Sequence, residues 1–349
     1  MNACLLTFTI SSVLATCLGV AGAHAAAVPP LTLEEVISAA GFDDRQRSDL
    51  LAGKIVTKDF DEGSDKEMSI LVASRVSLSL PEVVEAWREL LVLDFDEDLI
   101  AIGGIGTDQD VSEALAEVEF TAEDGDEIRG LLGVEPGSDF NLSKGEIARF
   151  ATLAKQFSSR GCERDAACRS AVNETYRSVL AERLAAYQKG GLGAITTYAR
   201  SRGKVADAGE ELHLAAEKLP LARRRVPEVY RAWLEYPRSQ PEGSQHLFLW
   251  LKRVVEGRPT FILSHRAIYE TDDAIFSVER HFYVGQFYNS LQMSSFIAAQ
   301  GSETIGILLN RTSTDKVAGF GTSAKKKIGR SKVRKALVGT FERLLADLK

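Results

Sequence analysis

The stretch from His246 to Asp315 constrains the fold more than any other part of this chain. It contains four runs rich in Phe, Ile, Val, Tyr and Trp, separated by short breaks that contain Gly, Pro or Asp. Such residues fit a pleated, half-buried surface, and such breaks suit turns. Consecutive strands joined by short turns predict an antiparallel meander. The runs are HLFLWLKRVV, PTFILSHRAIY, IFSVERHFYVGQFYNSLQMSSFIAA and ETIGILLNRTS.

A helix from Ser323 to Lys349 is predicted to follow the meander. Apolar residues recur there at spacings of four and three, which places them on one stripe of a helix. The stripe consists of Val333, Leu337, Phe341, Leu344 and Leu348. Both faces of the first strand are apolar, so at least one face of the sheet must be covered. We therefore expect an α+β fold in which the antiparallel meander packs on this long C-terminal helix.

The remainder of the chain divides by its hydrophobic period. Residues 26–106 predict helices, a strand over Glu67 to Leu78 and a helix over Pro81 to Leu91. Residues 107–240 have a helical period throughout, with the longest helix over Asp165 to Lys189. Residues 241–349 hold the sheet and the final helix. The chain of 349 residues is thus interpreted as a helical block inserted between a small front piece and the meander.

Charge is distributed unevenly along the chain. Residues 316–335 carry eight Lys and Arg and no acidic residue, and removing them from the net charge of -7 leaves about −15 for the rest. A body this acidic argues against a nucleic-acid partner. The basic half of the C-terminal helix either meets an anionic surface or complements the acidic body. The second interpretation is favoured, because charge runs are usually solvated faces.

Residues 1–25 have the features of a signal peptide. They contain no Asp, Glu, Lys or Arg, and Ala23-His24-Ala25 has the small-x-small form of a cleavage site. The apolar run is short and interrupted, which argues against a membrane-spanning helix. We expect cleavage after Ala25 and a mature protein in the periplasm or outside the cell.

Cys162 and Cys168 are the two thiols that remain after such cleavage. An even pair in an oxidising compartment favours a disulfide. Residues 158–161 interrupt the helix between them, so the bridge would cross a turn; two free thiols are the alternative.

Two resemblances are visible at this point. The order of strand, Pro-led helix, meander and C-terminal helix resembles the helix-grip fold of START-like proteins. That resemblance implies a sheet wrapped around a long helix, with an apolar ligand held between them. Three further segments resemble an uncharacterised family of exported bacterial proteins, with Gln286 as a departure from its pattern, and this resemblance implies no chemistry. The segments are Leu234 to Pro237, Tyr283 to Tyr288, and Asn310 to Asp315 with Gly319.

Histidines and aromatics in the meander are the first group of candidate site residues. With Gly257-Arg258 as the turn, Trp250 opposes His265. A next loop over Thr271 to Ile275 puts His281 on the same face, and a loop one residue shorter puts it on the other face. Such a row could bracket a ligand, shuttle protons or bind a metal, but hydrogen-bonded structural histidines are the favoured interpretation. Four aromatics could form one end of a ligand cavity, or simply belong to the core. They are Tyr269, Tyr283, Phe287 and Tyr288.

Asn310 and Arg311 are the second group. Arg311 is expected to contact Asp315 and Asn310 to hold the turn into the final helix, although the pair could instead grip a carboxylate or phosphate.

The sequence contains no HExxH, GxSxG, P-loop or dinucleotide-binding motif, so no catalytic residue, metal site or cofactor is predicted. We expect a non-enzymatic exported protein that binds a lipid or other apolar small molecule between the sheet and the C-terminal helix. The alternatives are an envelope protein-interaction module without a pocket and a hydrolase-like enzyme that uses His265 or His281.

Overall fold

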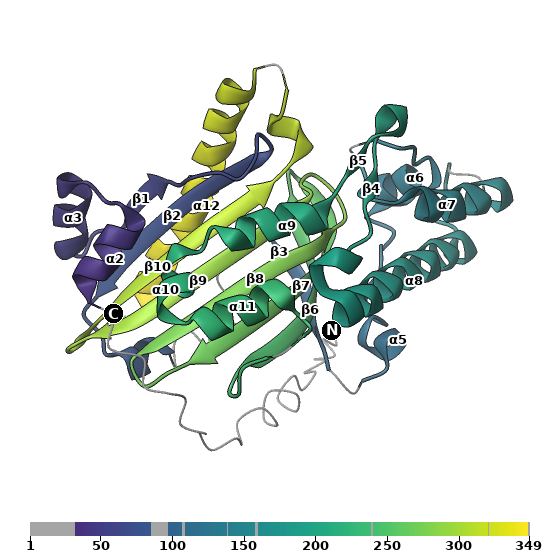
Figure 1. Ribbon diagram of the computed structural model, residues 1–349. Coiled ribbons are helices and arrows are strands. Elements are labelled where there is room, and N and C mark those ends of the chain that lie inside the picture. Colours follow the sequence, from purple (N-terminus) through teal and green to yellow (C-terminus); the bar gives the residue numbers. More distant parts are fainter. Residues whose placement is uncertain are drawn as a thin grey trace, which may run out of the picture.

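A large antiparallel sheet forms the centre of the protein (Figure 1). The computed structural model describes residues 32–84, 97–106, 109–137, 139–157, 160–238, 240–319 and 321–347. Within these residues the sheet has eight strands in the order β1-β2-β10-β9-β8-β7-β6-β3. The predicted meander is confirmed, since β6 to β10 pair consecutively. They are β6 (Gln245–Val255), β7 (Arg258–Glu270), β8 (Ala274–Val284), β9 (Ser290–Gln300) and β10 (Glu303–Ser313).

The other strands extend the two edges of the meander. β2 (Glu67–Val76) pairs with β10, β1 (Val56–Asp59) pairs with β2, and β3 (Leu99–Ile105) pairs with β6. The third apolar run of the sequence forms two strands, β8 and β9, because the chain turns between Val284 and Ser290. The front piece therefore supplies strands to the same sheet as the C-terminal part.

The hairpin between β6 and β7 differs from the predicted register. Val255 pairs with Arg258, so the turn is Glu256-Gly257, and both turn residues have positive φ (50° and 81°). That conformation matches the twist of a two-residue hairpin. Phe248 consequently lies opposite His265, and Trp250 lies opposite Leu263. The expected Trp250–His265 pair is thus wrong by two residues, although the two side chains keep the same face.

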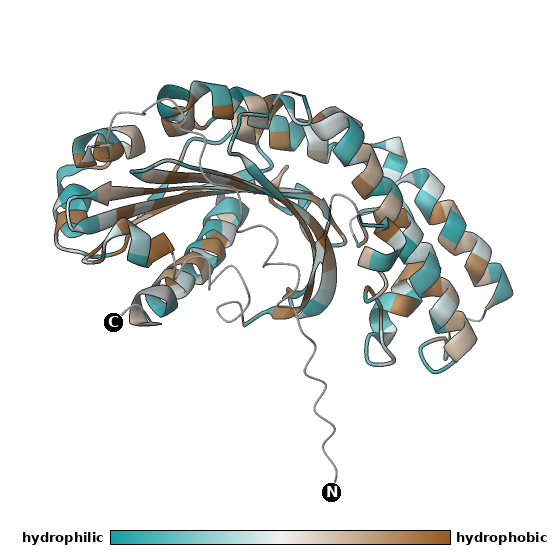
Figure 2. Cartoon of the chain, turned by 90° about the horizontal axis from the view of Figure 1, so that it is seen from below, coloured by the Kyte–Doolittle hydropathy of each residue, from teal (hydrophilic) through white to brown (hydrophobic). Residues whose placement is uncertain are grey.

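Helices cover the two faces of the sheet unequally (Figure 2). One face, called the helix-covered face below, lies under α2 (Leu33–Ala40), α9 (Ala208–Glu217), α10 (Pro220–Arg225) and α11 (Pro227–Glu235). α3 (Asp44–Leu51) lies beside β1 and β2. The opposite face, called the tail face, carries α12 (Thr322–Asp347), which contacts β2. The sheet curves towards α12 in Figure 2.

The remaining helices belong to the predicted helical block. They are α5 (Val111–Ala114), α6 (Gly125–Leu132), α7 (Lys144–Gln156) and α8 (Ala166–Gly190), followed by the short 3₁₀ helices η2 (Gly191–Ala194) and η3 (Ser201–Gly203). A two-stranded hairpin, β4 (Tyr198–Ala199) with β5 (Val205–Ala206), lies in the same segment. The apolar side chains of the helical block share one buried cluster with Phe248, Trp250 and Phe261 of the sheet. The block therefore packs on the β6–β7 end of the sheet.

The C-terminal helix has nearly the predicted bounds, but its apolar stripe is less buried than expected. Val333, Leu337 and Phe341 are half-buried, and the side chain of Leu344 and residue Leu348 lie outside the described part. The helix lies close to the sheet at Gly329, where a Cβ would overlap the sulfur of Met68 on β2. The expectation that the whole stripe is buried is therefore not met. η4 (Asp315–Val317) leads into this helix.

Cys162 and Cys168 form a disulfide, with Cα atoms 5.3 Å apart, as predicted. Cys162 precedes α8 and Cys168 lies in its first turn, so the bridge crosses the turn that leads into the helix. The predicted signal peptide lies outside the described residues, and so does most of the predicted helix over Pro81 to Leu91. Among the residues the structure describes, no helix is long and apolar enough to span a membrane.

Candidate functional site

A row of polar side chains crosses the helix-covered face of the sheet. His265, Arg280, Gln292 and Arg311 are successive neighbours on β7, β8, β9 and β10, and Ser69 of β2 follows Arg311. None of these residues is more than 3% exposed. Buried polar groups need hydrogen-bond partners, because an unpaired one costs stability. The partners of each member therefore show what the row can do.

The two arginines of the row have different surroundings. Arg311 Nη1 donates to Glu67 Oε1 at 2.8 Å, and Nη2 donates to the Asp61 carbonyl at 2.9 Å. Arg280 has no carboxylate of the described residues within 4.0 Å of its nitrogens. Its Nε donates to Gln292 Oε1 at 3.1 Å, its guanidinium lies against Tyr187, and its Nη2 has no partner. The amide nitrogen of Gln292 has no partner either.

A hydrogen-bonded chain of rings lies beside Arg280. The Tyr187 hydroxyl of α8 is 2.9 Å from His265 Nδ1, and His265 Nε2 is 2.9 Å from His246 Nδ1. Burial lowers the pKa of His246, and it lowers the pKa of His265 well below the usual value, with the Arg280 charge acting in the same direction. The ring of Tyr236 lies against that of His265, tilted by 49°, with ring centroids 4.5 Å apart. Both histidines are therefore neutral at neutral pH.

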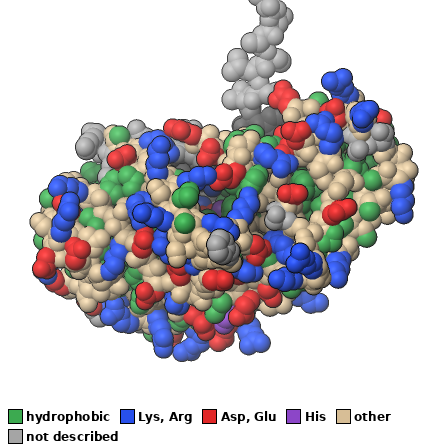
Figure 3. Space-filling model, turned by 90° about the horizontal axis from the view of Figure 1, so that it is seen from above, with side chains coloured by type: hydrophobic (Ala, Val, Ile, Leu, Met, Phe, Trp, Pro, Cys, Tyr) green, Lys and Arg blue, Asp and Glu red, His purple; other side chains and the backbone are tan. Residues whose placement is uncertain are grey.

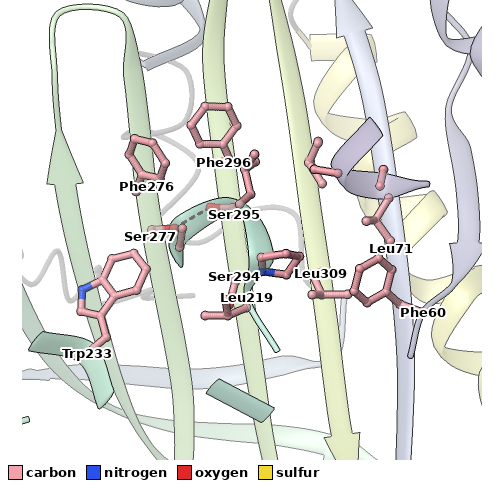
Figure 4. A pocket seen from close by; sticks show the side chains of 16 residues that line it. Phe60, Leu71, Leu219, Trp233, Phe276, Ser277, Ser294, Ser295, Phe296 and Leu309 are labelled. Carbon is pink, nitrogen blue, oxygen red and sulfur yellow. Dashed lines mark hydrogen bonds between the residues drawn. The ribbon is translucent and has the colours of Figure 1, made fainter. Parts of the chain in front are cut away.

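An apolar pocket of about 60 Å³ lies further along the same face (Figure 4). Trp233 and Leu219 approach it from the helices, while Phe60 and Leu71 approach it from the β1–β2 side, and strands β8 to β10 form its floor. Ser294 of the floor is two residues from Gln292 on β9, so both side chains lie on the helix-covered face of the sheet. Two polar atoms at the pocket have no partner among the described residues: Ser294 Oγ and Trp233 Nε1. The hydroxyls of Ser277 and Ser295 also line the pocket and are hydrogen-bonded to each other, and the remaining lining residues are apolar.

Several of the sequence candidates are core residues. Trp250 Nε1 donates to the Ala114 carbonyl at 2.9 Å, and the Tyr283 hydroxyl is 3.1 Å from that of Tyr176 on α8. Tyr269 lies in the cluster under α10 and α11. These three side chains therefore fasten helices to the sheet, as the core interpretation expected.

His281 is not in the row with His265. A register shift between Leu263 and Ser264 makes His281 the neighbour of Ser264, while His265 is the neighbour of Arg280. The two histidines therefore lie on opposite faces, and the predicted row of Trp250, His265 and His281 is wrong. On the tail face His281 Nδ1 is 2.8 Å from the Tyr288 hydroxyl, and Nε2 is 3.3 Å from Glu279 Oε1.

The second group of candidates is also separated. Arg311 pairs with Glu67 and not with Asp315. The side chain of Arg311 lies on the helix-covered face of β10, whereas Asp315 lies in the turn after that strand. Asp315 Oδ2 accepts from Arg200 Nε at 2.7 Å, and Oδ1 lies 2.8 Å from Lys66 Nζ. Asn310 lies within β10 on the tail face and accepts from Thr312 Oγ1 at 2.9 Å, so it does not hold the turn.

Phe287, the last aromatic candidate, has a φ of 76° in the turn between β8 and β9. Lys316 Nζ lies 4.5 Å from its ring centroid.

Arg280, Gln292, Tyr187, His246 and Trp233 were missed by the sequence analysis. Arg280 and Gln292 look like ordinary polar residues within apolar strands, and only the strand register shows that they meet under the helices. His246 differs, because a histidine at the start of the first strand was visible from the sequence.

Other features of the surface and interior are less specific. No group of three or more His, Cys, Asp or Glu side chains that could hold a metal ion occurs in the described part of the chain. Basic and acidic side chains are interspersed over the face shown in Figure 3, which has no large patch of one sign.

Comparisons with known proteins show little similarity. No protein-family model matches this chain, and no curated protein matches it. Among solved structures, a START superfamily protein from Mycobacterium smegmatis aligns over 29% of this chain and 66% of its own length. The sequence identity is 17% and the TM-score is 0.22. The resemblance to an uncharacterised exported family stays a prediction.

Proposed function

We propose that this chain is an exported binding protein, not an enzyme, that holds a small apolar molecule or the apolar part of a lipid. The observation that supports the proposal is the pocket between strands β8 to β10 and helices α2, α10 and α11. Four aromatic side chains line it, namely Phe60, Trp233, Phe276 and Phe296. Aromatic and aliphatic walls with few polar groups are typical of small-molecule sites.

This location differs from the one implied by the START-like resemblance. The helix-grip fold would place the ligand between the sheet and α12, and the curvature of the sheet towards α12 supports a helix-grip arrangement. The apolar pocket, however, lies on the opposite face. We therefore assign binding to the helix-covered face and leave α12 a structural role.

The pocket must enlarge to accept such a ligand. Its volume of about 60 Å³ corresponds to roughly two water molecules, far below the ~300 Å³ at which small-molecule pockets begin. α10 is a helix of 6 residues, and Pro220, Leu221 and Ala222 from it line the pocket. A short helix has few hydrogen bonds to hold it in place. Ligand entry is expected to displace α10.

A hydrolase that uses His265 and His281 together is not proposed, because these side chains lie on opposite faces of the sheet. A protein-interaction module without a pocket stays an alternative, which the following experiment distinguishes.

Decan-1-ol is a suitable uncharged probe, and binding is read from intrinsic tryptophan fluorescence, to which Trp233 at the pocket contributes, and from native mass spectrometry. Ala222→Phe fills the pocket from α10 and is expected to weaken decanol binding at least tenfold. Arg224→Phe is the matched control, since it adds the same side chain at an exposed position of the same helix. Equal binding to both variants, or none to the unmodified protein, would contradict the proposal.

A further inference from the structure

We infer that Arg280 is the centre of an anion-binding site that recognises the carboxylate of an amphipathic monocarboxylic acid, with the amide nitrogen of Gln292 as a second donor. The carboxylate part of this inference stands on Arg280 itself; the apolar part rests on the proposed function. The two parts are tested separately below.

The first argument is the uncompensated charge. An arginine side chain stays protonated in proteins, and a buried ion without a counter-ion is strongly unfavourable. Arg280 is 1% exposed, and its titratable neighbours Tyr187, His246 and His265 are neutral at neutral pH. Nothing described near Arg280 balances its charge.

Two other buried arginines of this chain provide an internal comparison. Arg183 of α8 binds Glu146 through Nε and Nη2 at 2.8 and 2.6 Å, and Arg311 binds Glu67 at 2.8 Å. Each of these guanidinium groups, like Arg280, is at most 4% exposed. The chain therefore supplies a carboxylate to each of these two and leaves Arg280 for a carboxylate from outside.

The geometry of the free donors favours a carboxylate. Because Arg280 Nε donates to Gln292 Oε1, the two side chains lie side by side. Arg280 Nη2 and Gln292 Nε2 are the atoms left without partners. Two neighbouring N–H groups suit a planar acceptor with two oxygens. A single negative charge would balance the single positive one, whereas a phosphate dianion would leave an excess negative charge buried.

The apolar part of the ligand is assigned to the pocket described above. Gln292 and the pocket residue Ser294 are two positions apart on one face of β9, a separation of about 7 Å. α11 contributes Trp233 to the pocket, and Tyr236, which follows the end of α11, lies beside His265. Tyr236 and His246 are half-buried and form the border towards solvent. A medium-length alkyl chain can therefore join the two sites.

The binding test compares decanoate with decan-1-ol, which differ in the carboxylate. The unmodified protein is expected to bind decanoate at least tenfold more tightly than decanol, and Arg280→Met is expected to remove that preference. Equal binding of the two probes to the unmodified protein would overturn the inference while leaving the proposed function intact. A preference for inorganic phosphate over decanoate would also overturn it.

A second variant keeps the inference testable if Arg280→Met does not fold. Gln292→Glu places an internal carboxylate beside Arg280, so it should raise the Tm of the ligand-free protein by several degrees and abolish the preference for decanoate. Gln245→Glu, at an exposed position of β6, is the matched control and should leave both unchanged. If neither probe binds, the proposed function fails. Gln292→Glu then decides alone, since an unchanged or lowered Tm would refute the anion site.

Discussion

His265 is buried beside Arg280, its neighbour across β7 and β8, and this burial makes the stability of the protein sensitive to pH. Burial and the nearby charge keep the pKa of His265 well below its ordinary value. The unfolded chain therefore binds more protons than the folded one below about pH 6.5, and the free energy of unfolding must fall as the pH is lowered. Glu279, whose pKa is depressed chiefly by the Arg266 charge, adds a similar loss only below about pH 4.5.

Urea unfolding at pH 7.5 and pH 5.5 measures this effect separately from that of Glu279. His265→Phe preserves the ring that stacks on Phe248 and removes the titration. We expect it to reduce the pH-dependent loss by about 1.4 kcal/mol, the value for one histidine that stays neutral in the folded state. His213→Phe, at an exposed position of α9, is the control. An unchanged pH dependence in His265→Phe would show that His265 is protonated in the folded protein.

Residue-level predictions from the sequence were correct for side-chain types and failed where they needed register. Alternation placed Trp250 and His265 on one face, and this is what the structure shows. The position of His281 depended on pairing through two hairpins, and the irregularity after Leu263 reversed its face. A one-residue irregularity moves all later side chains to the other side, and nothing in the sequence marks it.

At the scale of elements, the basic half of α12 packs on the acidic body, as the charge pattern indicated. Glu62 accepts from Lys326 Nζ at 2.7 Å and from Arg330 Nη2 at 2.6 Å. Glu62 and Lys326 are largely buried, and charge-assisted hydrogen bonds of this kind contribute about 1.5–3 kcal/mol each. We expect Glu62→Gln to lower the free energy of unfolding by about 2 kcal/mol, with a smaller effect at high salt.

Glu256 gives the matched control for that change. It pairs with Lys332 of the same helix at 3.1 Å, but both side chains are more than half exposed. Glu256→Gln should therefore change stability by less than about 0.5 kcal/mol. Equal effects of the two substitutions in urea unfolding would mean that Glu62 does not anchor the helix.

The positions of the helices and strands along the chain were largely predictable, but which of them pair or pack together was not. Hydrophobic period and turn residues located the meander, the longest helix and the C-terminal helix within a few residues. The front piece was expected to hold helices and a strand over Glu67 to Leu78, and the structure shows that β1, β2 and β3 complete both edges of the sheet. The paired residues of β2 and β10, and those of β3 and β6, are more than 140 positions apart, and such pairing leaves no local signal in one sequence. The incomplete burial of the apolar stripe around Phe341 was not predictable either, because amphipathicity shows which side of a helix is covered but not how completely it is covered.

At the scale of the whole molecule, the helical segment and the sheet share a core. Val172, Leu180 and Leu184 of α8 belong to the same buried cluster as Phe248, Trp250 and Phe261 of β6 and β7. Arg200, which follows β4, adds polar links to Asn141, Asn289 and Asp315. Two segments that bury their apolar side chains against each other cannot unfold independently, because unfolding one would expose the apolar side chains of the other.

We therefore expect the described part of the chain to unfold in one cooperative transition, in spite of the helical block that the sequence suggested. Leu180→Ala, which removes a fully buried side chain from the shared cluster, should cost about 2–5 kcal/mol. Hydrogen exchange in low urea should then show reduced protection in β9 and β10 as well as in α8, to the same extent. Glu174→Ala, at an exposed position of α8, should leave protection unchanged throughout. Loss of protection confined to α5–α8, with β10 unaffected, would show instead that the helical block is a separate folding unit. The destabilisation of α8 would then not reach the sheet through the shared cluster.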